Sequence, residues 1–165
     1  MILKSYEIQR NPSNFLKYNI FLLYGENIGL KKDVKEFIRR ALKEKDNNIE
    51  ILSAYENEIL GNDENFFNLV YSGSLFSDKK IITVYEATDK IIEKISNIHN
   101  KYPENIFLII FSDVLEKKSK LRNFFETNLK TLCVPCYLDN DKDLEIIANT
   151  ELKKNNIILS RESIN

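Results

Sequence analysis

The stretch Asn105-Ile106-Phe107-Leu108-Ile109-Ile110-Phe111 decides the fold. After Asn105 it is an unbroken apolar run, Ile106 to Phe111, with the length of one strand and far shorter than the ~20 residues that a membrane-spanning helix needs. Apolar side chains at every position are typical of a strand whose sheet is covered on both faces. The run therefore predicts a central strand of a mainly parallel sheet packed between helices.

Further strand-like runs lie around this stretch and alternate with helical patterns. Strands are expected at residues 19–24, 48–54, 80–85 and 131–137. Apolar residues at helical spacing predict helices over residues 30–43, 63–71, 88–100, 118–128 and 143–154. Because strands that alternate with helices form right-handed βαβ units, the sequence predicts an α/β fold of three layers. It has a mainly parallel five-stranded sheet of P-loop type, with helices on both faces.

The composition excludes several classes of protein. The chain has 165 residues, and 24 Lys and Arg against 25 Asp and Glu give a net charge of -1. With 43% hydrophobic residues it carries enough apolar surface to fold, which excludes a disordered chain. The balanced charge argues against a nucleic-acid binder that acts alone through phosphate contacts. Two cysteines and one histidine cannot furnish a four-ligand metal site without several carboxylates, so neither a metal nor a cofactor is expected.

The two ends of the sequence bear on location and completeness. Lys4 and Glu7 stand where the apolar run of an export signal would be. No apolar run approaches a membrane span, so we expect a cytoplasmic protein without a membrane partner. Residues 159–165 resemble the opening of a helix with Ser160 as its N-cap. The expectation from this ending is a chain that is cut within an element.

The loop after the first strand is where a phosphate binds in such a fold. Here it reads Gly-Glu-Asn-Ile-Gly-Leu-Lys-Lys from Gly25 to Lys32. Gly25 and Lys31 match the P-loop pattern G-x-x-x-x-G-K-[ST], whereas Leu30 and Lys32 replace its second glycine and its hydroxyl. A Cβ at Leu30 hinders approach of the backbone to a phosphate, and the lost hydroxyl removes a magnesium ligand. Gly25, Gly29 and Lys31 are therefore predicted to form a degenerate phosphate loop that does not function.

The third strand lacks the acidic pair that positions magnesium and water for nucleotide hydrolysis. It ends in Tyr85 followed by Glu86 alone. Together with the loop, this predicts nucleotide-binding ancestry without ATP turnover, and no catalytic residue. Two alternatives stay open: the loop is only a glycine turn before a helix, or the chain is a divergent P-loop NTPase or kinase that uses Lys31.

Several segments, taken in order, carry a family resemblance. They are Phe21-Leu22-Leu23-Tyr24-Gly25-Glu26, then Ser74-Leu75-Phe76 before a lysine-rich strand, Ile109-Ile110-Phe111-Ser112-Asp113, Lys117-Lys118-Ser119-Lys120-Leu121-Arg122, and Val134-Pro135-Cys136-Tyr137. In this order and spacing they resemble the delta subunit of the bacterial DNA polymerase III clamp loader. The resemblance extends over nearly the whole chain.

The resemblance implies a domain organisation and a set of partners. Residues 1–140 would form an AAA+-like domain without a functional ATP site, and residues 141–165 the beginning of a small helical lid domain. The C-terminal collar domain of the family would be absent. The chain would be a non-hydrolysing subunit of a DNA-directed DNA polymerase complex. Its implied partners are the sliding clamp (beta subunit) and the ATPase and delta-prime subunits of the loader, with primed DNA only within the assembly. A delta-prime-type subunit is a related alternative.

In this family an exposed hydrophobic pair enters a pocket of the clamp and promotes ring opening. The matching residues are Leu75 and Phe76, preceded by Ser74. The alternative is that both side chains pack in the core beneath the helix at 63–71. Three apolar residues of that helix are predicted to be core residues first, with one edge of the helix left open as a helper of the clamp contact: Phe66, Phe67 and Val70.

Other signals are given structural interpretations. Cys133 and Cys136 form a C-x-x-C within a strand-like run, so buried thiols are expected, with a redox function as the rival. His99 is expected to face solvent near a helix end. The arginine finger Ser-Arg-Cys of the ATPase-partner subunits is absent, and the nearest segment is Ser119-Lys120-Leu121-Arg122. The lysine pairs at 31–32, 79–80 and 117–118 are expected mostly on solvated faces.

Overall fold

The structure, a computed structural model, describes most of the chain up to residue 139. The described residues are 2–3, 15, 17–43, 48–73, 77–99, 102–139, 144–145, 148–149 and 152. Of Asp63 and His99 only the backbone is described.

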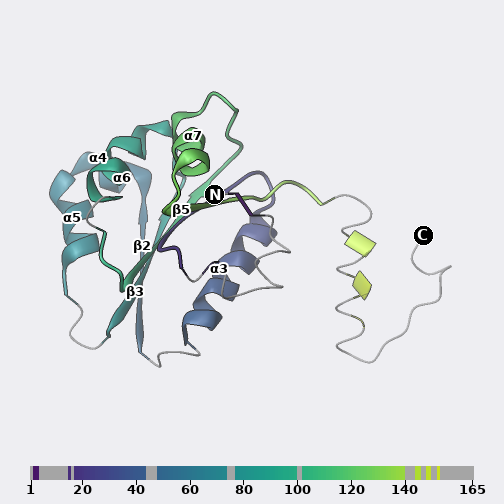
Figure 1. Ribbon diagram of the computed structural model, residues 1–165, viewed down its shortest axis with the longest axis horizontal. Helices are drawn as coiled ribbons and strands as arrows, with labels where there is room; N and C mark the ends of the chain where they lie inside the picture. The colour runs from purple at the N-terminus through teal and green to yellow at the C-terminus, as the bar shows by residue number, and fades with distance from the viewer. Residues whose placement is uncertain are drawn as a thin grey trace.

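Five parallel strands form one sheet in the order β2-β3-β4-β1-β5 (Figure 1). Their bounds are β1 Ile20–Tyr24, β2 Ile49–Tyr55, β3 Lys79–Tyr85, β4 Ile106–Ser112 and β5 Thr131–Pro135. The outer side of β5 is bordered by Ile2, which forms a parallel bridge with Cys133. β2 lies at the opposite edge of the sheet.

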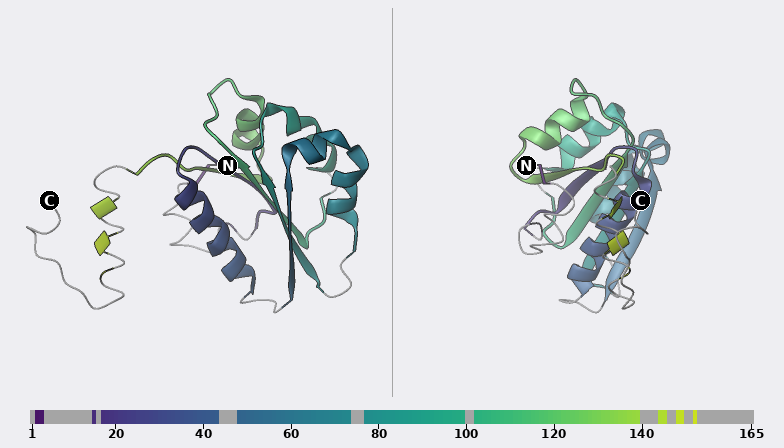
Figure 2. Two further views of the ribbon diagram at one scale, coloured as in Figure 1. Left: turned by 180° about the vertical axis from the view of Figure 1, so that it is seen from behind. Right: turned by 90° about the vertical axis from the view of Figure 1, so that its right-hand side faces the viewer.

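Helices cover both faces of this sheet (Figures 1 and 2). One face carries α3, Ile28–Lys43. The other face carries α4 Glu56–Gly61, α5 Asp63–Tyr71, the 3-10 turn η1 Asp89–Ile91, α6 Ile92–His99 and α7 Lys120–Thr127. The three layers follow from the strands, since apolar side chains on both faces need cover on both sides.

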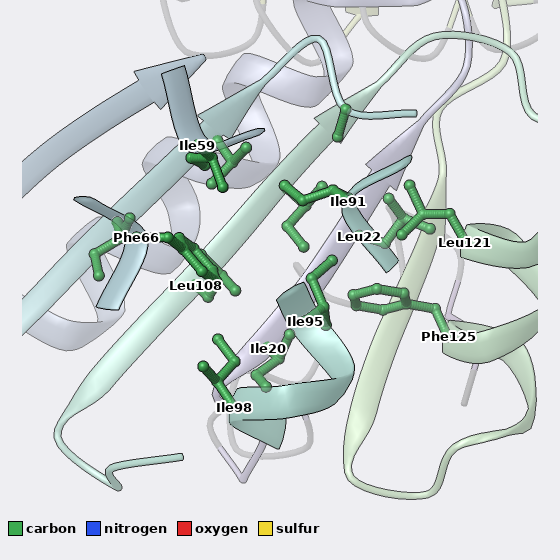
Figure 3. Close-up of a cluster of buried hydrophobic side chains, with 14 of the residues drawn as sticks. Ile20, Leu22, Ile59, Phe66, Ile91, Ile95, Ile98, Leu108, Leu121 and Phe125 are labelled. Carbon is green, nitrogen blue, oxygen red and sulfur yellow. The ribbon is translucent and has the colours of Figure 1, made fainter. Parts of the chain in front are cut away.

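The core consists of two clusters of buried side chains, one on each face of the sheet. Successive residues of a strand point to opposite faces, so Leu22 joins one cluster and Leu23 the other. All seven residues of β4 are buried, which explains the unbroken apolar run of its sequence. Figure 3 shows the cluster beneath α4, α5, α6 and α7, with strand residues Ile20, Leu22 and Leu108 and helix residues Ile59, Phe66, Ile91, Ile95, Ile98, Leu121 and Phe125.

The predicted fold class is confirmed, and the differences are local. The fifth strand ends at Pro135 rather than at residue 137. The expected helix at 88–100 is divided into η1 and α6. The short helix α4 was not predicted, because its six residues contain too few turns for a periodic pattern. The expected helix at 143–154 lies largely outside the described residues, although the five that are described there are helical.

Within the described part of the chain, no helix is long and apolar enough to span a bilayer.

Candidate functional site

The loop between β1 and α3 packs tightly against the end of β5. Gly25 has φ +127°, a conformation that residues with a Cβ rarely adopt. A Cβ on Gly25 would lie 2.1 Å from the carbonyl oxygen of Cys136. Glycine is therefore required here to let the two backbones approach, whether or not a phosphate ever binds.

Asn27 holds this loop in place. Its Oδ1 accepts the N–H of Leu30 at 2.9 Å, which caps the first turn of α3. Its own N–H donates to the Cys136 carbonyl at 3.0 Å, and its Nδ2 donates to Asp139 at 2.8 Å. An Asn directly before an apolar helical pattern is an N-cap signal that could have identified this residue from the sequence.

Two more loop amides, those of Gly25 and Lys31, donate to protein oxygens. The N–H of Gly25 donates to the Asp113 carbonyl at 3.2 Å, and that of Lys31 to the Asn27 carbonyl at 3.1 Å. Gly29 lies in the first turn of α3, where a Cβ would meet only ordinary contacts. In a working P-loop such amides surround the phosphates, whereas here four of them, at Gly25, Asn27, Leu30 and Lys31, bind the protein itself.

Lys31 is buried, with 4% of its side chain exposed. Its Nζ donates to the carbonyl of Ser112 at 3.0 Å and lies 3.7 Å from a carboxylate oxygen of Asp113. The Asp113 side chain is almost fully exposed, so the carbonyl is the stronger of the two contacts. The ammonium therefore binds the end of β4, and the prediction that Lys31 lies on a solvated face is wrong.

The end of β3 leads into a shallow cavity of about 460 Å³ between the loops that follow β3 and β4. Glu86 is exposed there with φ +58°. Asp89 accepts the Ser119 hydroxyl at 2.6 Å and the N–H of Leu121 at 2.9 Å, so it stabilises the start of α7. The hydrogen bond from Ser119 lowers the pKa of Asp89. Among the described residues no group of three or more His, Cys, Asp or Glu is placed to hold a metal ion.

Arg122 belongs to the segment 119–122, the nearest that the sequence has to the absent Ser-Arg-Cys motif, and its side chain is 16% exposed. Its Nε pairs with Glu126 at 2.7 Å, and an Nη donates to the Leu115 carbonyl at 3.0 Å. The guanidinium also lies over the Tyr24 ring, 5.1 Å from its centre. Burial and the hydrogen bond with Tyr137 raise the pKa of the Tyr24 phenol. The Arg122 guanidinium thus makes its contacts within the domain.

The predicted clamp-binding residues Ser74, Leu75 and Phe76 lie outside the described residues. The helix before them, α5, is described. Phe66 and Val70 are buried as predicted. Phe67 is 47% exposed, so its first assignment as a core residue is wrong, and it lies on an open edge of α5. It stacks on Tyr71, which is 42% exposed, with ring centres 5.6 Å apart.

Lys80 is a second lysine whose predicted solvation is wrong. It is buried on β3, and its ammonium binds the last turn of α5. Its position could have shown this, because Lys80, Ile82 and Val84 alternate along β3 and so share one face of the sheet.

The two cysteines are buried on opposite faces of the sheet, Cys133 in one core cluster and Cys136 in the other. Burial raises the pKa of each thiol to about 12. The prediction of buried thiols is confirmed. Because the two thiols lie on opposite faces of the sheet, they are badly placed to form a disulfide, which argues against the alternative of a redox function. His99 ends α6, but its side chain lies outside the described part of the structure.

The strand order, the glycine turn after β1 and the two helical layers define an AAA+-like α/β domain. The family described as DNA polymerase III, delta subunit, matches residues 21–136. The chain therefore belongs to the DNA polymerase III delta subunit family, as the resemblance predicted.

The chain is similar to one curated protein in sequence and to one solved structure in fold. A probable DNA polymerase III subunit delta of Rickettsia prowazekii is 25% identical over 150 residues, which cover 90% of this chain and 44% of the relative. The solved structure of the DNA clamp loader delta protein YqeN of Bacillus subtilis superposes with a TM-score of 0.65 and 11% identity. That superposition covers 97% of this chain and 50% of the other and shows a shared fold. The chain thus spans 44% and 50% of the lengths of these relatives.

Proposed function

We propose that this chain supplies the clamp-gripping part of a DNA polymerase III delta subunit. It binds the sliding clamp and promotes opening of the ring for loading onto primed DNA during replication. Ser74, Leu75 and Phe76 are the proposed contact residues, with Leu75 and Phe76 entering a pocket of the clamp. Burial of these two side chains contributes roughly 3–6 kcal/mol before the ordering of the segment is counted.

The observation that carries this proposal is the exposed aromatic pair at the end of α5. Phe67 and Tyr71 stack one turn apart on a helix that ends at Tyr71, shortly before Ser74. Exposed apolar patches mark interaction sites, and aromatic residues are enriched in protein interfaces. The pair therefore supports a partner-binding surface that continues from α5 into the proposed contact residues.

We also propose that the β1–α3 loop binds no nucleotide and that the chain hydrolyses none. A phosphate at this loop would compete with the hydrogen bonds of Gly25, Asn27 and Lys31 to protein oxygens. The alternative, an NTPase that uses Lys31, requires that ammonium to leave its buried contact with Ser112. These contacts favour the non-hydrolysing function.

The remaining parts of the proposal concern organisation and partners. Residues 1–140 are the proposed AAA+-like domain, and residues 141–165 the start of the lid domain. The proposed partners are the sliding clamp and the ATPase and delta-prime subunits of the loader, with primed DNA engaged through the assembly. The proposed place of action is the cytoplasm.

A titration of the chain against the sliding clamp of the same organism tests the proposal. The Leu75→Ala/Phe76→Ala variant is expected to bind about 100-fold more weakly, because it loses ~3 kcal/mol of apolar burial. A matched control is Leu129→Ala/Leu138→Ala, which truncates two leucines that are 86% and 70% exposed elsewhere on the domain. This control is expected to bind as the wild type does.

The proposal fails if a folded wild-type chain does not bind the clamp, or if both double variants bind equally well. Magnesium-dependent ATP binding that Lys31→Ala abolishes would instead support the NTPase alternative.

A further inference from the structure

We infer that Lys80 is a positioning residue for the clamp-binding segment, through a buried contact between its ammonium and the end of α5. The inference rests on the proposed function of Ser74, Leu75 and Phe76. It concerns only described residues on either side of that segment, and Lys80 itself need not touch the clamp.

The ammonium of Lys80 binds the point where the chain leaves α5. Its Nζ donates to the carbonyl of Ser72 at 2.6 Å and to that of Leu69 at 3.2 Å, and it lies 3.3 Å from the Ser72 hydroxyl. The last carbonyls of a helix have no partner within the helix, and a cation at this end also interacts favourably with the helix dipole. Lys80 therefore acts as a C-terminal cap that comes from a different element.

The surroundings of Lys80 explain why its ammonium is held there. The side chain is 5% exposed and lies on the sheet face that α5 covers. Glu50, its neighbour on β2, places a carboxylate oxygen 3.8 Å from Nζ. That oxygen is buried and has no hydrogen-bond partner among the described residues, so the ammonium is the charge that compensates it. A buried ammonium that meets several acceptors stays in a fixed position.

The same residue connects the two ends of the segment. Ser72 precedes it, and Lys80 follows it on β3, so the contact between them closes a loop between α5 and β3. The far end is fixed independently, because Asn105 donates to the carbonyl of Asp78 at 2.8 Å. The segment therefore starts and ends at held positions. Holding both ends before binding reduces the entropy that association must remove, which raises affinity without any new contact with the partner.

Lys80→Met tests this inference, because methionine keeps most of the apolar stem and removes the cation. The variant is expected to bind the clamp about tenfold more weakly, which corresponds to the ordering of one or two further side chains. A control of equal stability separates positioning from general destabilisation. Ile38→Val or Ile38→Ala, chosen to match the melting temperature of Lys80→Met, alters the core on the opposite face of the sheet and is expected to bind as the wild type does.

Hydrogen exchange gives a second readout. The N–H of Ser72 donates to the Asn68 carbonyl at 2.9 Å, and its exchange is expected to accelerate in Lys80→Met but not in the Ile38 control. If Lys80→Met does not fold, the clamp affinity of Ser72→Ala tests the inference instead. This variant removes the Ser72 hydroxyl, one acceptor of the ammonium, at an exposed position. A two- to threefold loss of clamp affinity at unchanged stability supports the inference.

Three outcomes would overturn it. The first is equal clamp affinity of Lys80→Met and the matched Ile38 control. The second is unchanged affinity of Ser72→Ala where Lys80→Met does not fold. The third, no clamp binding by the folded wild type, removes the proposed function and this inference together, whereas the first two leave the proposed function standing.

Discussion

Replacing Lys31 tests whether this lysine stabilises the fold or binds a phosphate. Lys31→Ala removes about three buried methylenes, worth ~0.8 kcal/mol each, and a hydrogen bond from an ammonium to a carbonyl, worth ~1–2 kcal/mol. The ammonium no longer has to be buried, which offsets part of this loss. We therefore expect a net loss of about 2 kcal/mol in the free energy of unfolding. A phosphate-binding lysine that pointed into an open loop would show no such effect.

Urea unfolding of the wild type and three variants measures this loss. With a typical slope of about 2 kcal/mol per molar urea, Lys31→Ala shifts the midpoint down by about 1 M. Lys31→Met, which keeps the apolar stem, is expected to lose less than half as much. Lys32→Ala is the matched control, because Lys32 is exposed at the next position of α3. The free energy of unfolding of this variant is expected within about 0.5 kcal/mol of the wild-type value.

The structural account of Lys31 would be refuted if Lys31→Ala and Lys32→Ala unfolded at the same urea concentration. It would also be refuted if magnesium and ATP raised the melting temperature of the wild type but not of Lys31→Ala, since that result requires the ammonium at a phosphate.

Two further predictions concern the glycine turn and the thiols. Gly25→Ala is expected to lower the free energy of unfolding, measured in urea, by about 3 kcal/mol or more, because φ is +127° and the new Cβ meets the Cys136 carbonyl. Gly29→Ala is the control and is expected to stay within about 1 kcal/mol of the wild type. Equal stability of the two variants would contradict this prediction. Burial raises the pKa of Cys133 and Cys136 to about 12 from 9.0, so the native state keeps thiol protons that the unfolded chain releases. The free energy of unfolding should therefore fall as the pH rises above 9, by up to about 1.4 kcal/mol per pH unit for each thiol, and less steeply in Cys133→Ala/Cys136→Ala; parallel pH profiles of the two chains would contradict it.

The fold could be predicted because both faces of the sheet are covered. A strand buried on both faces needs apolar residues throughout, and β1 and β4 carry such runs. Edge strand β2 is less regular, since only one neighbour and partial cover constrain it. The short helix α4 has no pattern of its own, and its buried Glu56 is fixed by hydrogen bonds with Thr88, a partner that the sequence does not reveal.

The candidate site was harder to predict, because the burial of its lysine side chains depends on contacts with elements that are distant in the sequence. Lys31 and Lys80 each stand next to a second lysine, which is typical of a solvated face. In both pairs one ammonium turns inward to backbone carbonyls that other elements supply, Ser112 for Lys31 and Ser72 for Lys80. Alternation along β3 indicates the burial of Lys80, but no sequence pattern identifies its acceptors. Phe67 was misassigned for a related reason, since helical spacing alone did not show which edge of α5 the sheet leaves open.

Hydrogen–deuterium exchange of the wild-type chain, with and without the sliding clamp, tests the central claim most directly. The account predicts that the clamp slows exchange in peptides that span α5 and residues 72–77, while peptides of the β1–α3 loop exchange at an unchanged rate. Slower exchange confined to the β1–α3 loop, or no change anywhere at saturating clamp, would contradict it.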